Sequence, residues 1–251
     1  MALEIGPRDS LDIGKVLAGA VSAGRARLGD LLIVAVFFLL LPQVLLGFAP
    51  GKFPDPEYGF WNFLASLPGM VFDGAAGLIL YGALSGGGAE PPAAGAIRGA
   101  LRRLARIFMV QVVAGVGIVL GLVLLIAPGL FLASVWLVAT PLLVIEDTTV
   151  AGALRRSLDL SKGSRWRLLA ILGIMTLIVV GLAIVFGGVL GVLIATAGPA
   201  DMQERLIKFI VTPILAVLVR VVTLSVITST YAELRRIEAG ATTRQVAQTF
   251  E

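Results

Sequence analysis

Histidine and cysteine are both absent from this 251-residue sequence, and charged residues make up only 14% of it. Without cysteine there is no thiolate nucleophile, and without histidine there is no imidazole to relay protons or to complete a Ser-His-Asp triad. The same absence removes metal sites built from Cys and His ligands. We therefore expect no catalytic residues, no cofactor and no metal site in this chain.

Long apolar runs dominate what remains. Hydrophobic residues make up 58% of the sequence, which lies outside the usual range of globular proteins. A helix needs about 20 apolar residues to cross the bilayer core. Five runs approach or exceed that length, at roughly 30–48, 62–85, 106–126, 168–196 and 206–230.

A sixth, shorter run extends from Leu130 to Ile145 and directly follows Ala127-Pro128-Gly129. Proline and glycine end one helix there and allow a tight reversal, so residues 106–145 are interpreted as a helical hairpin. A re-entrant pair is the alternative at this length. The sequence therefore predicts an all-α, polytopic membrane protein whose six transmembrane helices form three hairpins.

Basic residues are distributed unevenly between the two sides of these predicted spans. Sixteen of the twenty Lys and Arg residues precede the first span, follow the last, or lie in 86–106 and 146–167, all on one side. Because cytoplasmic loops carry the excess of Lys and Arg, both termini are predicted to be cytoplasmic. The net charge of +4 then serves topology and contact with anionic lipid, and we expect no nucleic-acid partner.

A basic stretch rich in Ala and Leu precedes each predicted hairpin, and the sequence GALRR occurs in two of them, at 99–103 and 152–156. Apolar residues recur at helical spacing with arginines mostly on the other faces, as in helices that lie in the headgroup plane. We therefore predict three repeats, each an amphipathic interfacial helix followed by a hairpin. The predicted organisation is a single transmembrane domain, 1–251, with amphipathic segments at 1–29, 93–105 and 148–162, a bundle over 30–230 and a cytoplasmic tail at 231–251.

The stretch ALRRSLDLSKGSRW, residues 153–166, lies between two of the most apolar spans. Thr148 or Thr149 can cap a helix at its start, and Gly163 supplies a left-handed stop, so local structure accounts for most of its residues. The free backbone N–H groups and dipole at the start of the fifth span also favour a lipid phosphate. A topological anchor and a headgroup site therefore both stay open. The candidate headgroup residues are Arg155, Arg156, Lys162 and Arg165.

Two charges fall near the middle of predicted spans, Asp73 in the second and Arg220 in the sixth. At about 1.5 Å of rise per residue, their depths differ by roughly 3 Å. An isolated charge at the centre of a span costs about 2.5–3.5 kcal/mol, so both are expected to face the bundle interior, where they can pair. The alternative is a polar cavity for a headgroup or a proton, with contributions from Gln111 and Thr176.

The block from Glu146 to Trp166 resembles a signature of bacterial six-span membrane proteins related to the membrane domain of glycerophosphoryl diester phosphodiesterases. The likeness also includes the APG turn at 127–129 and the closing TYAELRR at 230–236. Its motif residues are Glu146, Arg156, Ser157, Lys162, Gly163 and Trp166. In fused members the phosphodiesterase chemistry belongs to a separate soluble barrel. The resemblance therefore implies a multi-pass protein of the bacterial inner membrane without that hydrolase activity.

These observations favour a non-enzymatic membrane protein that engages anionic lipid headgroups, or a partner protein, through its cytoplasmic basic helices. The alternative is a small transporter or lipid-translocating protein that uses an intramembrane Asp73/Arg220 site. A membrane enzyme built on Glu146 and Asp147 is a third reading, although paired carboxylates at a helix end are also ordinary capping residues. The sequence specifies neither a substrate nor an oligomeric state.

Overall fold

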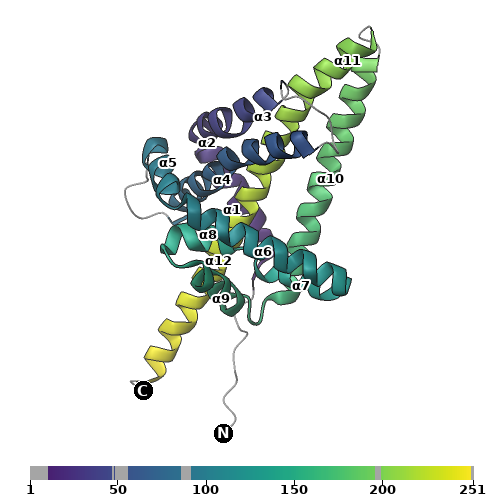
Figure 1. Ribbon diagram of the computed structural model, residues 1–251. Helices are drawn as coiled ribbons and strands as arrows, with labels where there is room; N and C mark the ends of the chain where they lie inside the picture. Colours follow the sequence, from purple (N-terminus) through teal and green to yellow (C-terminus); the bar gives the residue numbers. More distant parts are fainter. Residues whose placement is uncertain (1–10, 47, 49–55, 86–91, 196–198, 250–251) are drawn as a thin grey trace.

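Helices account for all regular structure in the residues that the computed structural model describes, which are 11–46, 48, 56–85, 92–195 and 199–249 (Figure 1). Six stretches are long and apolar enough to cross a membrane. The predicted class, an all-α chain with six candidate spans, is therefore confirmed.

The first half of the chain contains α1 (Ile13–Ala26), α2 (Leu28–Ala35), the π-helical segment η1 (Val36–Leu40), α3 (Leu41–Leu46), α4 (Pro56–Ser85), α5 (Ala93–Arg102) and α6 (Leu104–Leu124). The second half contains α7 (Ile126–Val135), α8 (Ala139–Glu146), α9 (Val150–Leu160), α10 (Arg165–Ala195), α11 (Ala200–Leu206), the π-helical segment η2 (Ile207–Val211) and α12 (Thr212–Thr249).

The three short helices α1, α5 and α9 each pack on a long span. Helix α5 packs on α4 and α9 packs on α8, which in both cases is the span just before it, whereas α1 packs on α12, the last span. The buried residues of these helices are Val16, Ala20 and Ala23 in α1, Ala96 and Ala100 in α5, and Ala153, Leu154, Ser157 and Leu160 in α9. Each of these helices therefore packs one face against the bundle, and the predicted position in the headgroup plane stays a prediction.

Side-chain caps begin two of these short helices. The Asp12 carboxylate accepts a hydrogen bond from the backbone N–H of Gly14 at 2.8 Å, and the Thr149 hydroxyl accepts one from Gly152 at 3.1 Å. Both satisfy N–H groups that have no partner within the helix. Helix α9 occupies most of the predicted segment 148–162, whereas α5 ends at Arg102, three residues before the predicted end.

The second and fourth candidate spans lie closest to the centre of the bundle, and α4 contacts both α8 and α12. The buried share is 59% in the second span and 50% in the fourth, against 11% in the third, 17% in the fifth and 22% in the sixth. The less buried spans expose apolar side chains, as helices that face lipid do.

Prolines interrupt the first and last spans in the same way. The backbone N–H before each proline bonds five residues back, from Leu41 to Val36 and from Thr212 to Ile207. Because Pro42 and Pro213 have no N–H and their rings clash with the carbonyl four residues earlier, the wider π-turn accommodates them. Helix α3 packs on η2, so the two interrupted spans meet.

The reversal between α6 and α7 lies at Leu125, whose backbone is extended (φ −162°, ψ 144°). The predicted turn, Ala127-Pro128-Gly129, is instead part of the first turn of α7, where a proline removes no intrahelical hydrogen bond. A Cβ atom at Gly121 would lie 2.9 Å from Gly129 Cα. The glycine at 129 is therefore required for the close approach of α6 and α7, not for the reversal.

Two further boundaries differ from the sequence prediction. The span predicted to run from Leu130 to Ile145 is broken, because α7 ends at Val135 and α8 begins at Ala139. The predicted tail, 231–251, continues α12 as a helix as far as Thr249. Residues 1–10 of the predicted amino-terminal segment lie outside the described residues, as do 250–251 of the tail.

Candidate functional site

The four cations proposed from the sequence as a headgroup site do not converge. Arg156 donates two hydrogen bonds to the Glu238 carboxylate, at 2.6 and 2.5 Å, and the Lys162 ammonium lies 2.7 Å from Asp159. The Arg165 guanidinium lies 5.1 Å from the centre of the Phe131 ring. Arg155 is exposed and has no ion pair within the part of the chain described here. No common ligand position is defined by these side chains.

Arg156 instead belongs to a polar network at one end of the spans. Its Nε lies 3.8 Å from Glu146, which also accepts a hydrogen bond from the Tyr231 hydroxyl at 2.9 Å. The hydrogen bonds to Glu238 raise the pKa of Arg156, and burial opposes that shift. The Arg235 guanidinium donates to the Tyr81 hydroxyl at 2.7 Å. These contacts connect α4, α8, α9 and α12, so Glu146 and Arg156 have structural partners.

The other motif residues described in this paragraph also have positions that the local structure explains without a ligand. Gly163 has a φ of 88°, the left-handed conformation expected at a helix end. The Trp166 side chain is 84% exposed at the start of α10, a position typical of an aromatic residue at a membrane interface. Ser157 is fully buried, and its hydroxyl donates to the backbone carbonyl of Val135 at 2.5 Å. That carbonyl lies at the end of α7, where the helical hydrogen bonds stop.

We expect Ser157→Ala to lower the free energy of unfolding by about 1–2 kcal/mol, because the Val135 carbonyl loses its shorter hydrogen bond in a buried position. The Ser161 hydroxyl, 3.3 Å away, offers only partial replacement. Unfolding by SDS in mixed micelles measures the loss. Ser22→Ala is the matched control, since the Ser22 hydroxyl is exposed and bonds within its own helix. Equal effects of the two changes would show that the Val135 contact adds nothing.

The structure brings Asp73 and Arg220 together. Arg220 donates to the two carboxylate oxygens of Asp73 at 2.7 and 2.5 Å, and the Gln111 amide donates to the same carboxylate at 2.8 Å. Thr176 takes no part, because its hydroxyl is exposed and bonds to Leu172 in its own helix. Three hydrogen bonds satisfy most of the acceptor capacity of Asp73 and join α4, α6 and α12. This arrangement suits a link between helices better than a transport site.

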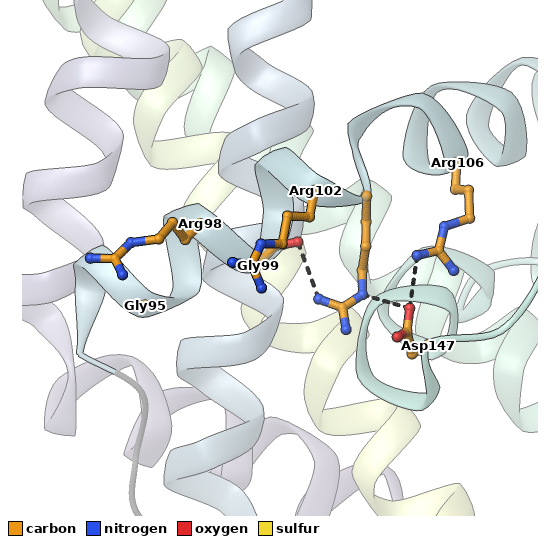
Figure 2. A pocket seen from close by; sticks show the side chains of 7 residues that line it. Gly95, Arg98, Gly99, Arg102, Arg106 and Asp147 are labelled. Carbon is orange, nitrogen blue, oxygen red and sulfur yellow. Dashed lines mark hydrogen bonds and ion pairs between the residues drawn. The ribbon is translucent and has the colours of Figure 1, made fainter.

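A second basic cluster, on α5 and the start of α6, forms a cleft of about 380 Å³ (Figure 2). We call it the arginine cleft. Four guanidinium groups line it against one carboxylate, an excess of three positive charges. The lining residues are Gly95, Arg98, Gly99, Arg102, Arg103, Arg106 and Asp147.

Asp147 orients one side of the arginine cleft. Its Oδ1 accepts a hydrogen bond from Arg103 Nε at 2.8 Å and lies 2.9 Å from Arg106 Nη2. The hydrogen bond from Arg103 is the largest cause that lowers the pKa of Asp147, so this carboxyl stays ionised at neutral pH. Its backbone is left-handed (φ 49°), which an aspartate tolerates at the end of a helix.

The other side of the cleft has unpaired cations. Figure 2 shows Arg106 turned toward Asp147, whereas Arg98 and Arg102 extend away from it along α5. Within the ranges that the structure describes, neither Arg98 nor Arg102 has a side-chain hydrogen bond or an ion pair, and both are exposed. Their guanidinium forks are therefore available to an anion.

The repeated GALRR sequence was the signal that could have identified the arginine cleft. Arg103 and Arg156 occupy the same position in the two copies, and each meets an acidic residue at the end of α8. The sequence alone does not show that Arg156 has a second carboxylate partner, Glu238, from a helix 82 residues away. Within the described residues the first arginine of each copy, Arg102 or Arg155, has no ion pair, so the two copies differ in the second carboxylate that reaches Arg156.

A bundle of apolar helices of bilayer length, with most of its charges gathered beside the helix ends, defines a multi-pass integral membrane protein. The model of the family described as the membrane domain of glycerophosphoryl diester phosphodiesterase matches residues 108–247. This match covers more than half of the chain, so the protein belongs to that family, and the resemblance seen in the sequence is confirmed. Comparison with curated proteins and with solved structures gave no match.

Proposed function

We propose that this protein is a non-enzymatic, multi-pass protein of the bacterial cytoplasmic membrane whose arginine cleft binds anionic lipid headgroups. The observation that carries the proposal is the composition of the cleft, in which four arginines face a single carboxylate. Arginine presents planar pairs of N–H donors that match phosphate oxygens, and it remains charged at every physiological pH.

The position of the cleft supports a ligand from the membrane surface. Arg98 and Arg102 lie on α5, and the first turn of α6, which contains Arg106, begins a candidate span at Leu104. The cleft therefore lies beside the end of an apolar candidate span, and in our proposal this position corresponds to the depth of lipid headgroups. The excess of Lys and Arg on this side favours a cytoplasmic orientation, where the leaflet is rich in anionic lipid.

The proposal assigns no catalysis to the chain. The sequence has neither His nor Cys, and the matched family model describes a membrane domain. The polar side chains at the end of α8 already have structural partners, since Glu146 accepts from Tyr231 and Asp147 accepts from Arg103. A protein partner that docks on the same basic face is the remaining option if no lipid binds.

Lipid retention tests the proposed function. We would reconstitute the protein in discs of phosphatidylcholine with a minor fraction of phosphatidylglycerol and count bound anionic lipids by native mass spectrometry. The variant Arg98→Gln/Arg102→Gln is expected to retain about tenfold less phosphatidylglycerol, because each lost contact to phosphate is a charge-assisted hydrogen bond.

The control is Arg155→Gln/Arg236→Gln, which removes the same charge from exposed arginines outside the arginine cleft. It is expected to retain lipid like the wild type. An equal loss in both variants would mean that lipid follows total charge and not a site. No retention of phosphatidylglycerol by the wild type would reject the proposed function.

A further inference from the structure

Apolar side chains of α6 beyond Arg106 are exposed on more than one face, since Val112 and Val119 are also 40% and 58% exposed. One row of them begins beside the arginine cleft. Counted from Arg106, the residues Met109, Val113, Val116 and Leu120 follow at three- and four-residue intervals, which place them on one face of the helix. All four are exposed, between 44% and 61%. We call this face the α6 stripe. It leads from the guanidinium of Arg106 along the candidate span, where an acyl chain of a bound lipid would lie.

The cleft and the stripe together match the two parts of one lipid molecule, an anionic headgroup and an apolar acyl chain. The basic end lies at the start of the candidate span, and the apolar side chains lie within it. A soluble phosphate compound would use the cleft alone, whereas a phospholipid uses both parts and gains from the contact with the stripe. The geometry therefore favours a lipid over a free phosphate.

Charge and donor count distinguish two kinds of phospholipid headgroup. A phosphodiester headgroup has one negative charge on two free oxygens. A phosphomonoester has three free oxygens and a charge of about −1.5 to −2 at neutral pH. A monoester therefore offers two arginines one more free oxygen and more negative charge than a diester does. The cleft offers two arginines without partners, Arg98 and Arg102, and an excess of three positive charges.

We propose that the arginine cleft and the α6 stripe form a site for phosphomonoester lipids, with the terminal phosphate held by Arg98 and Arg102 and an acyl chain along the stripe. This inference rests on the proposed function and specifies its ligand class. Asp147 is a positioning residue in this site, because its carboxylate holds Arg103 and Arg106 and leaves the other two arginines to the ligand.

The test compares lipids that differ by a single methyl ester. Discs of phosphatidylcholine would contain either phosphatidic acid, a phosphomonoester, or phosphatidylmethanol, a phosphodiester of nearly equal size. Native mass spectrometry at pH 7.5 is expected to show about tenfold greater retention of phosphatidic acid by the wild type, since the extra contact is one charge-assisted hydrogen bond. Arg102→Gln is expected to remove this preference, and Arg155→Gln is expected to keep it.

The possible outcomes separate the two proposals. Equal retention of the two lipids above phosphatidylcholine would overturn the ligand class and leave anionic-lipid binding intact. Retention of neither lipid would reject both proposals. If millimolar inorganic phosphate removes the bound lipid, or if Val113→Ser/Val116→Ser leaves retention unchanged, the phosphate contact alone determines binding and the role of the stripe is wrong. A preference that survives Arg98→Gln/Arg102→Gln would place the site elsewhere.

Discussion

Asp73→Asn is expected to lower the free energy of unfolding by about 3 kcal/mol, because it leaves the Arg220 charge inside the membrane without a counterion. Arg220→Met should cost less. The Asp73 carboxylate keeps its hydrogen bond from Gln111, so it still has a polar partner within the bundle. SDS-induced unfolding in mixed micelles, followed by tryptophan fluorescence, measures each loss.

The double variant Asp73→Asn/Arg220→Met completes a thermodynamic cycle. We expect it to be more stable than Asp73→Asn alone, with a coupling free energy of about 2 kcal/mol between the two positions. Strictly additive losses would show that the two side chains stabilise the protein independently and that the ion pair does not link α4 to α12. The cycle also tests the transporter alternative, since a purely structural pair leaves any measured flux unchanged once stability is restored.

Gly129→Ala is expected to destabilise the contact between α6 and α7 by about 1–3 kcal/mol through overpacking. A Cβ atom at this position would lie 2.6 Å from the backbone nitrogen of Leu122 and against its side chain. A backbone atom cannot move aside as the end of a flexible side chain can, so the two helices must separate. The same unfolding assay, or the midpoint of thermal unfolding in a mild detergent, reports the change.

Gly187→Ala is the matched control for this prediction. It also adds one methyl group to a glycine in an apolar helix, but no atom lies within 4 Å of the new Cβ position. Alanine favours the helical conformation by up to about 1 kcal/mol over glycine. The control is therefore expected to leave stability unchanged or to raise it. A loss at Gly187 equal to that at Gly129 would contradict the close-packing explanation.

The spans were predictable because their signal is local. Each apolar run is long enough to be recognised by itself, and the caps follow the rules for short polar residues at helix starts, as Thr149 shows. The pairing of Asp73 with Arg220 was also within reach, since an isolated charge in hydrocarbon needs a partner at its own depth. Only these two charged residues lie near the middle of the predicted spans, so the sequence offered a single candidate pair.

The arginine cleft was not predictable in the same way. Two stretches share the sequence GALRR, and the sequence has no local feature that says which of them lines a cleft. Arg102 and Arg103 line one together with Arg98 and Arg106, whereas Arg156 meets Glu238, because α12 continues as a helix beyond the predicted span. The glycines of the apolar helices also differ in a way that the sequence alone does not show. Gly121 packs against Gly129, whereas Gly187 and Gly191 have no neighbour within 4 Å among the described residues.

The packing of α1 on α12 has a consequence for synthesis. The Ser229 hydroxyl donates to the Val16 carbonyl at 2.7 Å across 213 residues of sequence. Ribosomes add about 5–20 residues per second, so α1 is complete roughly 10–40 seconds before its partner exists. Helices α5 and α9, in contrast, are made after the spans that receive them. Helix α1 is therefore synthesised first but packs last. Its apolar face has no packing partner on α12 until the end of the chain has been made.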